Sequence, residues 1–180
     1  YISRLLGRGD RETADRAAST ALYSSIFVGA AVILCAVIFL KPLLKCLGAT
    51  DSILPYAVTY AGIYVVSSIF NVFNVTMNNI VTSEGAARTT MCVLLTGAAL
   101  NMVLDPVFIY VLKLGVAGAA IATAISQAVS TLVYLYYVIS GRSMFCFRFR
   151  NCCFSNEIMS EILKIGIPTL AFQLLTSLSI

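Results

Sequence analysis

The chain has 180 residues and a formal net charge of +4, with 59% hydrophobic and 11% charged residues. Soluble globular proteins contain about 45–50% apolar and about 25% charged residues. This composition argues against a soluble domain, because the chain supplies too little polar side chain to cover a folded surface. We therefore expect an all-α integral membrane protein, a polytopic helix bundle.

The two ends of the sequence indicate an internal fragment of a longer protein. Neither a start methionine nor a signal sequence precedes the charge-rich segment 1–18, which we interpret as a cytoplasmic link that follows a truncated helix. Asp10 lies just before an acidic turn and predicts the start of a new helix. At the other end the chain stops inside an apolar run.

Uncharged apolar runs predict four complete membrane spans, since about 20 apolar residues cross a hydrocarbon core. Each run is bounded by charged residues or by glycine. The fourth run is rich in Ala, Gly, Ser and Thr, which allow close helix packing, so we expect it at the centre of a bundle. The spans are residues 19–40, 53–81, 89–112 and 116–139; residues 140–164 form a further link, and 165–180 begin the next span.

One acidic side chain, Asp105, lies inside an otherwise uncharged apolar run. An ionisable residue at membrane depth is a candidate ion or substrate site. Asn101 lies four residues earlier, on the same helix face, and both side chains offer oxygen atoms to a cation. A structural alternative remains, in which Asp105 pairs with backbone groups freed by Pro106.

The second span carries a row of amides, Asn71, Asn74 and Asn78, on one helical face. This face should look into protein or water. Interhelical hydrogen bonding would explain the row, as would the lining of a substrate cavity, with Gln127 on the fourth span as a further candidate.

The cluster CFRFRNCC, which includes Cys146, Cys152 and Cys153, lacks the CxxC spacing of a zinc site, and the chain has no histidine. We expect reduced thiols and no bound metal beyond a coupling ion. The interleaved arginines indicate contact with lipid headgroups and not with nucleic acid.

Basic residues predict the orientation. Nine of the 12 Lys and Arg residues lie on one side of the membrane when the spans alternate. By the positive-inside rule, links 1–18, 82–88 and 140–164 are cytoplasmic, and Asp105 lies toward the outer half of its span.

Four segments together resemble the multidrug and toxic compound extrusion (MATE) transporters. SRLLGRGDRETADRAA is similar to the link between their helices 2 and 3, and NNIVTSEGAARTTM to the helix 4 to 5 region. NMVLDPVFIYVLKLGVAGAAIATAISQAVS resembles helices 5 and 6, and ILKIGIPTLAFQLLTSLS the start of helix 7. The resemblance covers nearly the whole chain and implies part of one six-helix lobe of a twelve-helix transporter.

The resemblance implies a Na⁺- or H⁺-coupled antiporter that exports organic, often cationic and amphiphilic, compounds across the cell (plasma or inner) membrane by alternating access. It implies a cation site in this lobe at Asn101, Asp105, Thr123 and the backbone of Ala119, completed by an aspartate on helix 1, which this chain lacks. No cofactor, nucleic acid or obligate protein partner is implied, and membrane lipid surrounds the spans.

Two alternatives remain. A lipid-linked oligosaccharide flippase of the same superfamily would carry basic residues in its cavity, whereas the four spans contain none. A membrane-embedded enzyme is disfavoured, because the spans hold no paired acids and no nucleophile–base arrangement, so we expect no enzymatic activity.

Overall fold

The fold is taken from a computed structural model. It describes residues 2–46, 48, 50, 53–145, 160, 164, 166–168, 171 and 175–176. These residues belong to two compact units, one formed by 1–23 and 145–180 and the other by 24–144. The links and partial span expected at 140–164 and 165–180 fall largely outside the described residues, as do Cys146, Cys152 and Cys153.

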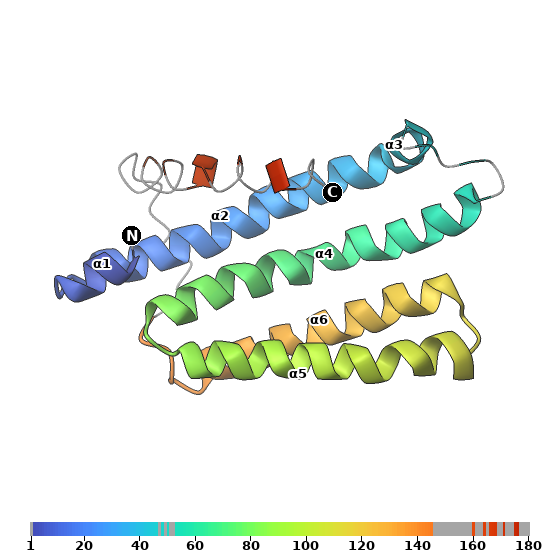
Figure 1. The fold of residues 1–180 in the computed structure, drawn as a ribbon. Coiled ribbons are helices and arrows are strands. Elements are labelled where there is room, and N and C mark those ends of the chain that lie inside the picture. Colours follow the sequence, from blue (N-terminus) through green and yellow to red (C-terminus); the bar gives the residue numbers. More distant parts are fainter. Residues whose placement is uncertain are drawn as a thin grey trace. The chain divides into compact units, whose positions relative to one another are not determined.

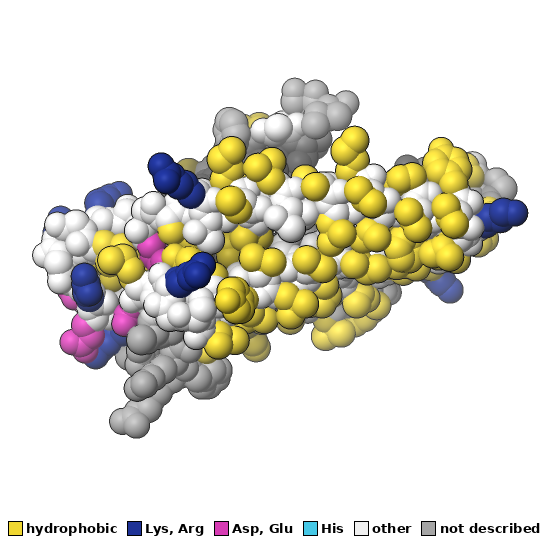
Figure 2. All heavy atoms as spheres, turned by 90° about the horizontal axis from the view of Figure 1, so that it is seen from below, with side chains coloured by type: hydrophobic (Ala, Val, Ile, Leu, Met, Phe, Trp, Pro, Cys, Tyr) yellow, Lys and Arg dark blue, Asp and Glu magenta, His cyan; other side chains and the backbone are white. Residues whose placement is uncertain are grey.

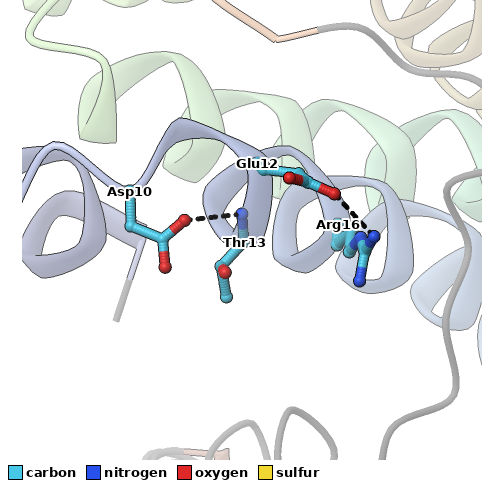
Figure 3. A network of polar contacts seen from close by, with 4 residues as sticks. All are labelled: Asp10, Glu12, Thr13 and Arg16. Carbon is cyan, nitrogen blue, oxygen red and sulfur yellow. Dashed lines mark hydrogen bonds and ion pairs between the residues drawn. The ribbon is translucent and has the colours of Figure 1, made fainter.

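In the first unit a short helix, α1 (Ile2–Gly7), is followed by the start of the long helix α2 (Arg11–Ile38). Gly9 adopts a positive φ of 80° between them, a conformation that glycine tolerates well. Asp10 caps α2: its Oδ1 accepts a hydrogen bond from the backbone N–H of Thr13 at 3.1 Å (Figure 3). The prediction that a helix starts after Asp10 is confirmed.

One turn into α2, Arg16 pairs with Glu12 at 2.6 Å (Figure 3). The two residues are four positions apart and exposed, so the pair adds a few tenths of a kcal/mol to this turn at most. α2 therefore begins eight residues before the apolar run at 19–40. The Asp10 cap and the pair of Glu12 with Arg16 support a helix through this charged segment.

The described residues include four helices long and apolar enough to cross a membrane, so the chain is a multi-pass membrane protein. They are Arg11–Ile38, Leu54–Ser83, Ala87–Val111 and Val116–Ile139. Large apolar side chains such as Phe27 and Met102 are 78% and 80% exposed. Hydrophobic side chains cover the middle of the helices in Figure 2 and charged ones lie near the helix ends. Such a surface suits lipid and not water. The all-helical membrane fold is confirmed.

Three helices form the core of the second unit (Figure 1): α4 (Leu54–Ser83), α5 (Ala87–Pro106) and α6 (Val116–Ile139). α6 packs along both α4 and α5, as its small residues predict. It runs parallel to α4 and antiparallel to α5, because each of the two links reverses the chain. α3 (Leu40–Cys46) follows α2 and packs on α4.

The end of the bundle that contains the turn between α4 and α5 is held together by Glu84, which lies in that turn. Its carboxylate accepts hydrogen bonds from the hydroxyl of Ser143 and, at 3.3 Å, from that of Tyr137. The turn between α4 and α5 is thereby joined to the end of α6.

Within the expected span 89–112 the helix changes character. α5 ends at Pro106 and continues as one π-helical turn, η1 (Val107–Val111). A π turn contains one extra residue relative to an α-helix and often accompanies functional sites. In this chain the π turn η1 packs against α6.

Candidate functional site

The residues expected at a cation site come together where the C-terminal half of α5 packs against the N-terminal half of α6. Nδ2 of Asn101 donates hydrogen bonds to Oδ1 of Asp105 at 3.3 Å and to Oγ1 of Thr123 at 3.4 Å. Oγ1 of Thr123 donates to the backbone oxygen of Ala119 at 3.0 Å. All four residues are half-buried. We call these four residues the Asp105 cluster.

Helix geometry explains this cluster. Asn101 and Asp105 are one turn apart on α5, and Ala119 and Thr123 are one turn apart on α6. The antiparallel packing of the two helices then brings the two pairs face to face. The sequence spacing predicts each pair, but only the packing of α5 on α6 joins them.

A cavity of about 480 Å³ lies among α4, α5 and α6. Its wall includes the amides of Asn71, Asn74, Asn78 and Gln127, together with Asn101 and Thr123 of the Asp105 cluster. The cluster therefore borders the cavity. The residues that line it carry no formal charge: Asn71, Asn74, Val75, Asn78, Asn79, Val93, Leu94, Gly97, Ala98, Asn101, Thr123, Ser126, Gln127, Ser130 and Tyr134.

Both the nitrogen and the oxygen of the Asn74 side-chain amide form hydrogen bonds. Its Nδ2 donates to the side-chain oxygen of Gln127 at 2.7 Å and to the backbone oxygen of the same residue at 2.9 Å. Its Oδ1 accepts from Thr131 at 3.0 Å. Asn74 therefore joins α4 to α6, in agreement with the packing interpretation of the amide row, and its side chain also lines the cavity.

Asn78, one turn along α4, donates from Nδ2 to the hydroxyl of Tyr134 at 3.2 Å. Asn71 lies in the wall on the other side of Asn74. Asn74 and Asn78 thus contact α6 and, like Asn71, line the cavity. That the cavity holds a substrate stays a prediction.

Several lining residues were not anticipated from the sequence. Ser126, Ser130 and Tyr134 extend one face of α6 beyond Thr123 and Gln127. The signal was available, because Thr123, Gln127, Ser130 and Tyr134 follow helical spacing. The small hydroxyl residues of α6 also suit close helix packing, so their presence alone does not predict a cavity.

The Asp105 cluster offers a cation three kinds of oxygen: a carboxylate, a hydroxyl and a backbone carbonyl. Hard cations prefer such ligands. Rotation of the Asn101 side-chain amide by half a turn exchanges the positions of its nitrogen and its oxygen. The cluster then offers a fourth kind of oxygen, that of an amide.

The expectation that the cysteine cluster holds no zinc stays a prediction, because Cys146, Cys152 and Cys153 lie outside the described residues. Cys35, Cys46 and Cys92 are free thiols. No group of three or more His, Cys, Asp or Glu side chains converges among the residues searched.

Three comparisons place this geometry among known proteins. The family model MatE matches residues 1–107. The chain is 31% identical over 175 residues to the multidrug export protein MepA of Staphylococcus aureus (strain bovine RF122 / ET3-1). The aligned region covers 97% of this chain and 39% of MepA.

Among solved structures, an outward-facing multidrug resistance MATE family transporter of the MOP superfamily is similar with a TM-score of 0.91 and 34% identity. That match covers 98% of this chain and 40% of the other. An inward-facing conformation of such a transporter is similar with a TM-score of 0.87 and 34% identity, covering 93% and 38%.

The chain spans about two fifths of the length of the relatives it matches. The resemblance inferred from the four sequence segments is confirmed by the family model, by the curated relative and by the fold. This chain belongs to the MATE (MatE) family.

Proposed function

We propose that this chain is part of a cation-coupled antiporter that exports organic, often cationic, amphiphilic compounds by alternating access. The observation that carries the proposal is the Asp105 cluster at the edge of an uncharged polar cavity. The name of the relative MepA, a multidrug export protein, supports the same direction of transport.

The cavity supports this class of substrate. Amides and hydroxyls can hydrogen-bond a compound of varied shape, while apolar residues such as Val75 and Leu94 contact its hydrophobic part. A lining without formal charge does not repel a cation. It also lacks the Lys and Arg side chains that a pyrophosphate would need, which favours the antiporter over a lipid-linked oligosaccharide flippase.

The comparisons also support alternating access. This one chain is similar to an outward-facing and to an inward-facing transporter, with TM-scores of 0.91 and 0.87. A segment that keeps its internal fold in both conformations can move as a body, which is how repeat-based transporters expose a site to each side in turn.

The coupling ion, Na⁺ or H⁺, would bind at Asn101, Asp105, Thr123 and the carbonyl of Ala119. Binding would neutralise the one acidic side chain within the apolar runs at 19–40, 53–81, 89–112 and 116–139. It would thereby change the free energies of the inward and outward states to different extents. The cell membrane is the proposed location, with links 1–18, 82–88 and 140–164 in the cytoplasm.

The test uses the full-length protein in everted vesicles under imposed Na⁺ or H⁺ gradients. We expect Asp105→Asn and Asn101→Ala to reduce cation-driven efflux by about tenfold, equivalent to ~1.4 kcal/mol, while membrane insertion is retained. Thr123→Val should reduce efflux in the same way because it removes a ligand hydroxyl.

Thr96→Val is the matched control, since the hydroxyl of Thr96 is exposed and donates to the backbone of its own helix. Its efflux should equal that of the wild type. Unchanged efflux in Asp105→Asn and Asn101→Ala would exclude these residues from coupling, and an absence of gradient-driven efflux in the wild type would exclude the proposed function.

A further inference from the structure

Gly118 lies in the first turn of α6 and is buried against the π turn η1. A Cβ atom added at Gly118 would lie 2.8 Å from the backbone oxygen of Phe108, 2.9 Å from its carbonyl carbon and 3.1 Å from its Cβ. The first two atoms belong to the backbone and cannot turn aside as the end of a side chain can. Only a residue without a side chain fits this contact.

The carbonyl of Phe108 is held in place from a second direction. The backbone N–H of Leu114 donates to its oxygen at 3.1 Å, across the link from η1 to α6. Gly115, between that donor and Gly118, adopts a positive φ of 56°. The link therefore folds back tightly and presses the first turn of α6 against η1.

This contact adjoins the Asp105 cluster on both helices. Asp105 precedes Phe108 by three residues on α5 and η1, and Ala119 follows Gly118 directly on α6. The hydrogen bond from Asn101 to Thr123 is already long, at 3.4 Å. A displacement of α6 by a few tenths of an ångström would break it, because hydrogen bonds weaken steeply beyond this length.

We propose that Gly118 is a positioning residue of the cation site: its contact with the Phe108 carbonyl sets the distance between the α5 and α6 halves of the Asp105 cluster. The inference rests on the proposed function, because it assigns a role at the same site. Gly118 touches neither cation nor substrate in this role and acts through the spacing of the two helices.

The main variant is Gly118→Ala in the full-length protein, reconstituted in liposomes. Transport is measured as a function of cation concentration or pH, and separately as a function of drug concentration. We expect the half-maximal cation concentration to rise by about fivefold, or the midpoint to shift by about 0.7 pH unit for a proton. The KM for the drug should change by a smaller factor than the cation midpoint, because the cavity is also lined by α4 and α5, which the substitution does not displace.

Gly62→Ala is the matched control. Gly62 is also a glycine inside a membrane-spanning helix, but a Cβ there meets only the end of the Leu40 side chain at 3.8 Å. Helix propensity favours alanine at both positions. A loss confined to Gly118→Ala therefore reports the contact with η1 and not the general effect of replacing glycine.

A second pair of variants keeps the inference testable if Gly118→Ala does not fold. Phe108→Ala and Phe108→Gly both lose the aromatic ring, but only Phe108→Gly loses the Cβ that a side chain at position 118 would meet. Only Phe108→Gly also frees the η1 backbone. We expect the cation midpoint to shift more in Phe108→Gly than in Phe108→Ala.

The outcomes separate the two proposals. If wild-type transport is cation-driven and Gly118→Ala has the wild-type midpoint, or if the two Phe108 variants have equal midpoints, the positioning role is wrong and the proposed function stands. A change in drug KM with an unchanged cation midpoint also contradicts it. If the wild type shows no cation dependence, both proposals fail together.

Discussion

At the scale of single residues, Asn74 shows how one amide can connect helices in a membrane. Its three hydrogen bonds to Gln127 and Thr131 join α4 to α6. Interhelical hydrogen bonds in membrane proteins average about 0.6 kcal/mol each. We expect Asn74→Ala to lower the free energy of unfolding by about 1–2 kcal/mol, measured by thermal or denaturant unfolding in detergent.

Asn79→Ala is the control for this change, because Asn79 borders the same cavity with an exposed side chain. It removes an equal number of atoms and should change the stability by less than half as much. Equal losses in the two variants would show that the network around Asn74 contributes no more than the general cost of removing an amide.

At the scale of elements, the start of α2 depends on the charge of Asp10. Hydrogen bonds from the hydroxyl and the backbone N–H of Thr13 lower the pKa of Asp10 below its ordinary value. A lowered pKa in the folded state means that the cap stabilises the helix above the unfolded pKa of about 3.9, and that this stabilisation is lost as the pH falls through the lower folded value.

We therefore expect amide exchange protection at Thr13 to be constant from neutral pH down to about 4 and to fall below it. Asp10→Ala should lack the protection at every pH. Asp10→Asn is the control, because asparagine caps a helix without titrating in this range. Protection in the wild type that does not change with acid, as expected for Asp10→Asn, would contradict the role of the carboxylate.

The same scale shows what the sequence predicts and what it does not. Long uncharged runs predict the four apolar helices, because a membrane imposes length and composition directly. Helix spacing predicts the pair Asn101 and Asp105. By contrast, η1 and α3 were not predicted, because a π turn and a helix break depend on how the chain packs beyond Pro106 and after Ile38.

The Asp105 cluster includes a pairing of residues that local sequence spacing does not predict. Thr123 lies 22 residues after Asn101, and only the antiparallel packing of α5 on α6 brings them together. The resemblance to known transporters supplied this pairing in advance. The contact between Gly118 and Phe108 required coordinates, since a small residue in a membrane helix has many structural explanations.

At the scale of the whole molecule, polar groups are segregated by position. Apolar side chains cover the lipid-facing middle of the spans, amides and hydroxyls line the interior cavity, and Lys, Arg, Asp and Glu lie mainly at the ends of the helices. Asp105 is an exception, and its carboxylate accepts a hydrogen bond from Asn101, which lines the cavity. A bundle of this kind keeps its polar interior apart from lipid.

The distribution of basic residues predicts which end of the bundle faces the cytoplasm. We expect a cysteine introduced as Ala87→Cys, at the start of α5, to react with a membrane-impermeant maleimide only in broken cells. A cysteine introduced as Leu114→Cys, in the link from η1 to α6, should react in intact cells. Both positions are exposed, so access to the reagent depends on the side of the membrane.

The labelling is done in the full-length protein after its native cysteines have been replaced, so that Cys35, Cys46 and Cys92 do not contribute to the signal. The reverse pattern, with Ala87→Cys labelled in intact cells and Leu114→Cys protected, would invert the orientation. It would also place the Asp105 cluster at the cytoplasmic side. Under the proposed function, the driving cation would then reach the cluster from the opposite side, so the orientation would set the direction of the proposed coupled transport.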